Sequence, residues 1–454
     1  MKQYNPNRHH PSLIKFDWFV WATISVVPVI YISYILCYYE RAESILGLFL
    51  VEWLVVILFW KILCPWLGAK SIALASVLFL LSFCMAAIVC RENTIAYGTV
   101  WTGSDDWWYL NQAGDVVRFL HASNGNPIKA WNELTSNESG RWSLSGWPFL
   151  LGYISSLITS EPEPNLLHAI ALSLNSVFLT CVLALVYNII DEPAKCFPWR
   201  TLFFSLLIIF DPIIYAAMSL KESMLQLSLM LTFVFCYKSS RQLSPSWFIL
   251  GLIGIIGLIT CRVVYIFLIA ILIGWIILNK YKTNNLIKIA IYFTICAVFW
   301  KLFFDSQLRE QTIAEYMIGR SLEGQEGLAM RIYKIKLIGP IVFYALSPMP
   351  PLPWKILTQN QIIVVLIRGI GSVAWVFSAY YVLRGIFSNP ALFKNRLFVA
   401  AGIMFLGLFA AAVIYADDSR YKQPTNFFLG ILLVLTWYNG RINRWPCKIL
   451  PRRP

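Results

Sequence analysis

Long uninterrupted runs of apolar residues constrain the fold of this chain more than any other feature. Runs such as 16–39 and 71–90 can each cross the hydrocarbon core of a bilayer, which takes about 20 helical residues. Within lipid, only helices and closed barrels satisfy every backbone hydrogen bond, and these runs lack the two-residue alternation of barrel strands. With 58% hydrophobic and 13% charged residues, the composition is also not that of a soluble domain. The sequence therefore predicts an all-α integral membrane protein.

About twelve transmembrane helices fit the hydropathy pattern. We interpret residues 1–454 as a single polytopic membrane domain with two long polar loops, 91–165 and 305–358. Two shorter apolar stretches, 144–158 and 336–347, break the charge pattern if they span, so we expect interfacial or re-entrant helices there. The expected spans are 17–39, 45–63, 71–90, 166–190, 201–217, 220–237, 246–260, 262–279, 286–304, 359–383, 397–415 and 424–440.

Basic residues predict the side of the membrane on which each connection lies. With a cytoplasmic N-terminus, the short cytoplasmic connections carry Lys and Arg, for example at Lys61, Lys238 and 280–288, which is the positive-inside pattern. Most of the 23 Asp and Glu residues then fall on or towards the outer side, as do both long polar loops. We expect both termini in the cytoplasm and, because no eukaryotic targeting signal is evident, a bacterial cytoplasmic (inner) membrane.

The net charge of +14 fits this topology together with contact to anionic lipid. No basic stripe with interleaved aromatic residues suggests nucleic acid as a partner. The four histidines do not have a metal-ligand spacing, and no phosphate-binding glycine loop, dinucleotide motif or nucleophile elbow occurs. We therefore expect no metal and no cofactor, and the sequence defines no oligomeric state.

The first candidate site is an acidic pair, Asp105 and Asp106, followed by Trp107 and Trp108 in the first outer loop. A carboxylate can take a proton from an acceptor hydroxyl, while the aromatic rings offer apolar faces to a sugar. The structural alternative is that Ser104 or Asp105 caps a short interfacial helix and that the tryptophans belong to an aromatic belt.

Two further candidates lie where predicted spans meet the outer surface. Lys221 and Glu222 follow Asp211 and Pro212 at one hairpin, where they can reach a polar substrate. The alternative for this pair is a snorkelling lysine beside a glutamate that favours a helix N-terminus. Arg262, between two apolar runs, offers forked donors to a phosphate, or else pairs with an acidic neighbour or a lipid headgroup.

The fourth candidate is the polar turn before the last predicted span. Its residues Arg420, Tyr421 and Lys422 can neutralise and orient a phosphate, although a solvated loop tip commonly has such a composition. The carboxylate of Glu52 falls within a predicted span. We expect its side chain to form a hydrogen bond inside the bundle, with a proton relay as the sharper alternative.

Taken in order, these motifs resemble the GT-C superfamily, multi-span glycosyltransferases that use polyprenyl-phosphate-linked sugars. The chain departs from the usual pattern by placing three spans before the acidic loop, and by having Val263 where many relatives have proline. The matching elements are the acidic pair, the proline-led stretch Gly146-Trp147-Pro148-Phe149-Leu150-Leu151, the hairpin residues Asp211-Pro212 and Ser219 to Glu222, Arg262, and the turn Arg420-Tyr421-Lys422-Gln423-Pro424.

The resemblance implies inverting transfer of a sugar from a polyprenyl-phosphate donor to a glycan or lipid-linked acceptor at the extracytoplasmic face. Asp105 or Asp106 would be the general base, and basic residues would stabilise the departing lipid phosphate. The nearest alternative is a polymerase or ligase of polysaccharide repeat units, which also uses lipid-linked glycans. A transporter or flippase would instead place its charges in a midplane cavity, and a membrane scaffold would need no clustered charges.

Overall fold

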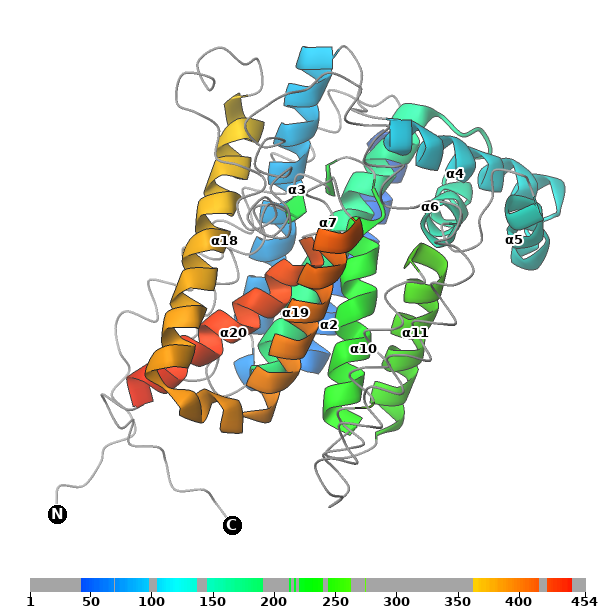
Figure 1. Cartoon of the computed structure of the whole chain (residues 1–454). Coiled ribbons are helices and arrows are strands. Elements are labelled where there is room, and N and C mark those ends of the chain that lie inside the picture. Colours follow the sequence, from blue (N-terminus) through cyan, green and yellow to red (C-terminus); the bar gives the residue numbers. More distant parts are fainter. Residues whose placement is uncertain are drawn as a thin grey trace.

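The computed structural model describes residues 42–68, 70–97, 104–136, 145–190, 212–213, 216–217, 220–239, 244–262, 274, 362–415 and 423–442. Within these ranges the chain folds into helices and contains no strand (Figure 1), which confirms the all-α class. Five of the described helices are long and apolar enough to cross a membrane. They are α2 (Ala42–Leu63), α3 (Lys70–Tyr97), α7 (Pro164–Ile189), α11 (Pro245–Arg262) and α18 (Ile362–Ser388).

Other predicted spans also coincide with helices: α10 (Glu222–Ser239), α19 (Arg396–Tyr415) and α20 (Gln423–Ile442). The apolar stretch 144–158 contains α6 (Gly146–Ser156), and the first polar loop holds two more helices, α4 (Ser104–Ala122) and α5 (Pro127–Ser136). The remaining predicted elements lie wholly or mostly outside the described residues: 17–39, 201–217, 262–279, 286–304, the loop 305–358 and the stretch 336–347.

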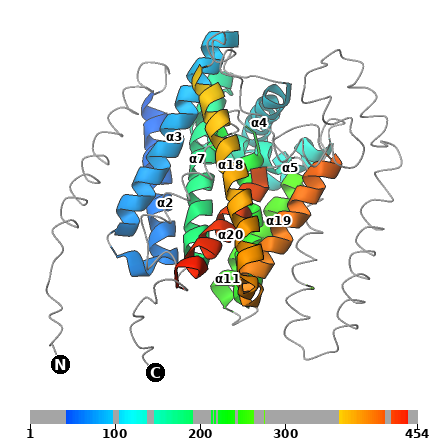
Figure 2. The same ribbon diagram turned by 60° about the vertical axis from the view of Figure 1, so that its left-hand side comes forward.

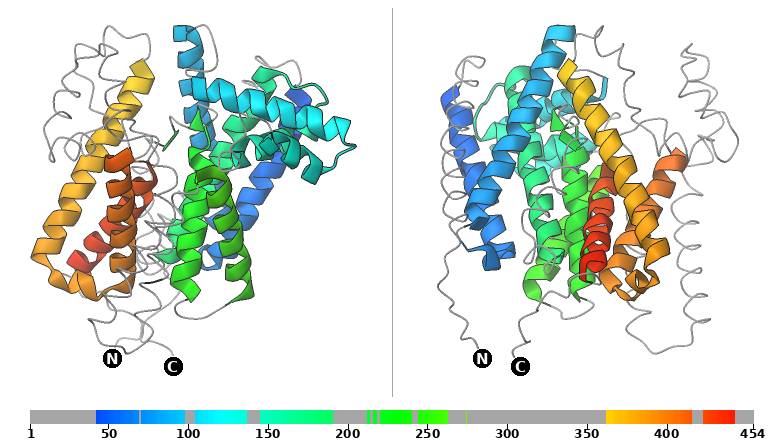
Figure 3. Two further views of the ribbon diagram at one scale, coloured as in Figure 1. Left: turned by 45° about the vertical axis from the view of Figure 1, so that its right-hand side comes forward. Right: turned by 90° about the vertical axis from the view of Figure 1, so that its left-hand side faces the viewer.

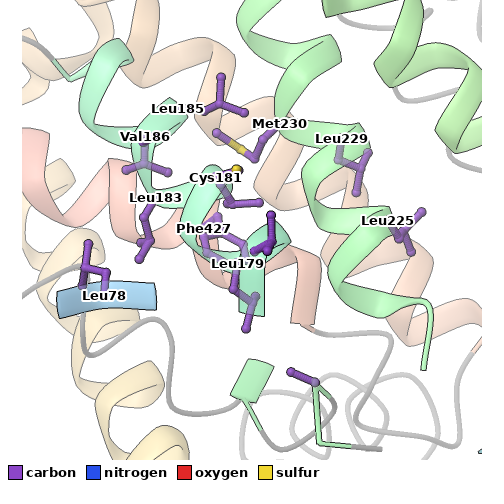
Figure 4. Packing of buried hydrophobic residues seen from close by; sticks show 14 of the residues in the cluster. Leu78, Leu179, Cys181, Leu183, Leu185, Val186, Leu225, Leu229, Met230 and Phe427 are labelled. Atoms are coloured by element: carbon purple, nitrogen blue, oxygen red, sulfur yellow. The ribbon is translucent and has the colours of Figure 1, made fainter. Parts of the chain in front are cut away.

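Helix α7 is the centre of the described bundle and packs against α2, α3 and α10. Of its membrane-spanning window 94% is buried, against 28% for α2 and for α11. Its small polar side chains permit this burial because they bond to their own helix, as Thr180 Oγ1 does by donating to the Ser176 carbonyl at 2.8 Å. A side chain of α2 also forms a hydrogen bond with the backbone of α7: Trp60 Nε1 donates to the Thr180 carbonyl at 3.1 Å. Figure 4 shows the apolar packing that completes this core, in which Cys181 lies near Met230 of α10 and Phe427 of α20.

Glycines let α10 and α11 pack as a close antiparallel pair. An added Cβ at Gly251 would lie 2.3 Å from the Phe235 ring, and one at Gly254 would lie 2.8 Å from the Ser228 carbonyl oxygen. A Cβ at Gly257 would meet Ser228 Oγ at 2.2 Å. Because these three glycines recur every third residue of α11, one face of this helix is small enough for the α10 backbone to approach it.

The described bundle has two chemically distinct ends. Helices α4, α5 and α6 lie across one of them, the α4 end, at an angle to α10 and α11 (Figure 3). At the other, the η end, lie the short helices η1 (Pro65–Leu67), which connects α2 to α3, and η3 (Pro390–Lys394), at the lower ends of α18 and α19 in Figure 2. Among the described residues, the η end has no Asp or Glu and exposes Lys61, Arg384, Lys394 and Arg396, whereas the α4 end exposes Glu133, Glu161 and Glu163.

Candidate functional site

The start of α10 buries two charged side chains at the α4 end of the bundle. Lys221 and Glu222 each have only 2% of their surface exposed. The backbone just before them is held by Asn175 of α7, whose Nδ2 donates to the carbonyls of Ala216 at 3.1 Å and Leu220 at 3.3 Å. Charged side chains are almost never buried this deeply without partners, so the partners define the site.

Arg262, the last residue of α11, is the partner of Glu222. Its Nη2 lies 3.9 Å from Glu222 Oε1, and its side chain is 15% exposed. This distance makes an ion pair without a hydrogen bond, because a hydrogen bond would need about 3 Å. Arg262 thus pairs with an acidic neighbour, which is one of the structural alternatives that the sequence left open.

Lys221 is placed by an aromatic ring from the first polar loop. Its Nζ lies 5.5 Å from the ring centroid of Tyr109 on α4, within the range of a cation–π interaction. The snorkelling expected of a lysine at a span end is thus not observed, since the side chain is buried. Two cations, Lys221 and Arg262, and one carboxylate, Glu222, therefore gather at this end of the bundle.

Two buried oxygens near the start of α10, Glu222 Oε2 and Gln226 Oε1, lack hydrogen bonds within the described part of the chain. They lie one helical turn apart, so both belong to the same face of α10. Gln226 also links this face to the start of α20, because its Nε2 donates to Gln423 Oε1 at 3.4 Å. Buried acceptors without donors are rare, and a ligand hydroxyl or a water would satisfy them.

Helix α4 brings the acidic motif to the same end of the bundle. Asp105 and Asp106 lie in its first turn, and position 105 precedes Tyr109 by four residues, which puts both positions on one helix face. Trp107 is 44% exposed, while Trp108 is half-buried and packs edge-to-face on Tyr109 with ring centroids 5.0 Å apart. A helix does begin at Ser104, but with 19 residues it is not the short helix of the structural alternative.

Helix α6 joins α4 to the α10–α11 pair. A Cβ on Gly146, at the start of α6, would lie 2.3 Å from Thr260 Oγ1, two residues before Arg262. At Gly152 a Cβ would lie 2.5 Å from the Ala113 carbonyl oxygen of α4. Because both contacts are so close, α6 fixes the distance between the acidic helix and the end of α11.

The structure thus unites part of the predicted site. Lys221, Glu222 and Arg262 form one cluster, and Tyr109 connects it to the helix of Asp105, Asp106, Trp107 and Trp108. Arg420, Tyr421 and Lys422 lie outside the described residues. Gln226 lies outside every motif predicted from the sequence, whereas Tyr109 and Gln423 fall within predicted motifs but were given no role of their own. The sequence does contain a signal for Gln226, because its polar amide side chain lies one turn after Glu222 in an otherwise apolar helix.

Buried polar pairs also occur deeper in the bundle. Ser173 of α7 donates a hydrogen bond to Glu52 of α2, which confirms that Glu52 bonds within the bundle. Cys90 and His168 form a second pair, with the sulfur 3.3 Å from Nε2. Among the described residues, no three His, Cys, Asp or Glu side chains are grouped to hold a metal. Both pairs link α7 to a neighbouring helix, the first to α2 and the second to α3.

Comparison of the chain with protein families, with curated proteins and with solved structures finds no match in any of the three.

Proposed function

We propose that the chain is a membrane glycosyltransferase that moves a sugar from a polyprenyl-phosphate donor to a glycan or lipid-linked acceptor. The observation that carries this proposal is the buried cluster of Lys221, Glu222 and Arg262 at the end of the bundle where the acidic helix α4 lies. Its cations suit a phosphate, and the unbonded oxygens of Glu222 and Gln226 suit sugar hydroxyls. A donor whose tail stays in lipid also gives a reason for building the site at the end of apolar helices.

In the proposed reaction, an acceptor hydroxyl oxygen attacks the anomeric carbon as the bond from that carbon to the phosphate oxygen breaks. The hydroxyl proton passes to the carboxylate of Asp105 or Asp106, and the bonding electron pair leaves with the lipid phosphate. Attack opposite the leaving group inverts the anomeric configuration. Lys221 and Arg262 stabilise the charge that develops on the phosphate. Position 105 is favoured as the base because it shares a helix face with Tyr109.

The proposal includes a topology of about twelve spans in a bacterial inner membrane, with the α4 end extracytoplasmic and both termini cytoplasmic. What supports this orientation is the set of exposed cations at the η end, where the described residues include no carboxylate. Arg420, Tyr421 and Lys422 join the donor site in this proposal, because α20 starts directly after them and Gln423 bonds to Gln226.

The position of the charges favours a transferase over a transporter or flippase. Lys221 and Glu222 stand at the beginning of α10, and Arg262 at the end of α11, so the cluster lies at one end of the bundle. A transporter would hold its substrate near the midplane. A repeat-unit polymerase or ligase would share the phosphate site and differ in its acceptor.

Transfer of labelled sugar by purified protein in lipid nanodiscs tests the proposal. The donors are polyprenyl-phosphate sugars, hexoses and pentoses, supplied with a lipid extract as the source of acceptors. We expect transfer with at least one donor, and a loss of roughly tenfold to a hundredfold in Lys221→Met, the value of one charge-assisted contact. Lys129→Met, which removes an exposed cation of α5, should keep full activity. Absence of transfer with every donor, or equal activity of the two variants, contradicts the proposal.

A further inference from the structure

The turn that connects α18 to α19 at the η end concentrates positive charge that no carboxylate among the described residues neutralises. Arg384, Lys394 and Arg396 are all exposed. Residues 362–415 include no Asp or Glu, and neither does α20, which packs against both α18 and α19. None of these three cations forms an ion pair with any residue that the structure describes. Their mutual repulsion is therefore not relieved within the described fold.

This turn is rigidly built. Asn389 Oδ1 accepts the Ala391 amide hydrogen at 3.2 Å, and Asn395 Oδ1 accepts those of Leu397 at 2.9 Å and Phe398 at 3.3 Å. Leu392 anchors the turn in the core with 1% exposure. Arg396 is also the first residue of α19, where the helix dipole disfavours a cation unless an anion is near. The cations are thus held close to one another by the fold.

Two phenylalanine rings stand exposed beside these cations. Phe387 has 84% of its surface exposed and Phe393 has 57%. Large apolar rings in such positions are costly in water and favourable in the acyl boundary of a bilayer. The span in α18 ends at Ser388, so this turn lies where lipid headgroups begin. A ligand with an anionic head and an apolar tail matches both features at once.

We propose that the turn from Arg384 to Arg396 is a binding site for an anionic phospholipid. The headgroup phosphate lies among Arg384, Lys394 and Arg396, and the acyl chains lie against Phe387 and Phe393. This site is at the opposite end of the bundle from the proposed transfer site and does not depend on it. The ligand is a structural lipid of the η-end leaflet, recognised by its net negative charge.

Native mass spectrometry of the full chain, released from micelles that contain equal amounts of phosphatidylglycerol and phosphatidylcholine, tests this site. We expect wild-type protein to retain phosphatidylglycerol preferentially. Each cation near an anionic headgroup contributes a factor of about five, so Arg384→Gln, Lys394→Gln and Arg396→Gln together should weaken retention roughly a hundredfold. A matched control removes three exposed cations that lie away from the η end, Arg91→Gln, Arg118→Gln and Lys129→Gln, and should retain the lipid as the wild type does.

Further arms separate lipid from other anions. Phe387→Gln with Phe393→Gln should reduce lipid retention while leaving the weak binding of free glycerol phosphate unchanged. If the triple variant does not insert, the three single substitutions, each expected to cost about fivefold, replace it. Equal retention of phosphatidylcholine, an equal loss in the control, or binding of free glycerol phosphate as tight as that of the lipid would overturn the proposal. So would an acidic protein that occupies the turn in place of lipid.

Discussion

The contact between α10 and α11 gives the sharpest test of the packing that assembles the candidate site. Gly254 faces α10, and a Cβ added there would lie 2.6 Å from Thr232 Oγ1, 2.8 Å from the Ser228 carbonyl oxygen and 2.9 Å from Leu231 Cβ. Normal van der Waals contact is about 3.5 Å or more. A rotamer change of Thr232 can relieve only one of these contacts. Gly254→Ala must therefore push the helices apart by several tenths of an ångström.

Overpacking of this kind costs about 1 to 3 kcal/mol in the free energy of unfolding. Alanine in place of glycine also stabilises a helix by about 1 kcal/mol, and this gain has to be subtracted. Gly402→Ala in α19 measures the gain alone, because nothing lies within 4 Å of the Cβ it adds. We therefore expect Gly254→Ala to be less stable than Gly402→Ala by about 1 to 3 kcal/mol.

Equilibrium unfolding in mixed micelles with increasing sodium dodecyl sulfate, followed by tryptophan fluorescence, measures this difference. A second pair of variants shows whether the contact itself is the cause. At Gly257 the added Cβ meets Ser228 Oγ at 2.2 Å but Ser228 Cβ only at 3.1 Å, so Ser228→Ala should restore most of the stability lost in Gly257→Ala. The reasoning is refuted if Gly254→Ala and Gly402→Ala are equally stable, or if Ser228→Ala gives no rescue.

Three further predictions concern the proposed chemistry and topology. Asp105→Asn or Asp106→Asn should abolish sugar transfer without loss of membrane insertion, because each substitution removes only the base. Wild-type turnover in both variants would exclude a base in this loop. Arg420→Ala should lose roughly tenfold to a hundredfold in transfer rate and Arg420→Lys less, with unchanged thermal stability in detergent; unfolding with preserved activity per folded molecule would indicate a structural role. In a background without native cysteines, a single cysteine at position 105 should be labelled from outside the membrane, and one within 280–288 from inside. Labelling of both from the same side refutes the topology.

The sequence alone determined the helices that cross the bundle. The ends of α2, α7, α11 and α19 fall within a few residues of the predicted segments 45–63, 166–190, 246–260 and 397–415. This agreement has a local cause, because a run of about 20 apolar residues in lipid has no alternative to a helix that satisfies its own backbone. Within the polar loop 91–165 that constraint is absent: a short helix from Ser104 was only an alternative, and neither the length of α4 nor its neighbour α5 was predicted.

The central place of α7 was decided only by the tertiary structure. The hydropathy of its spanning window, 2.3, is close to the 2.2 of α2, yet 94% of the window is buried in α7 and 28% in α2. Apolar side chains enter lipid and a protein core about equally well, so hydropathy cannot distinguish these surroundings. Ser173, Asn175 and Thr180 on α7 were the only local hint, because small polar residues favour helix contacts.

The partners within the candidate site also required the tertiary structure. The sequence indicated Lys221, Glu222 and Arg262 as charges at span ends, and it left a snorkelling lysine and a lipid-bound arginine as alternatives. The choice depended on the close approach of α11 to α10, which brings Arg262 to 3.9 Å from Glu222, and on Tyr109, which covers Lys221. The physical reason is that a side chain's charge is local, whereas its desolvation and its partner are set by whichever distant segment packs over it.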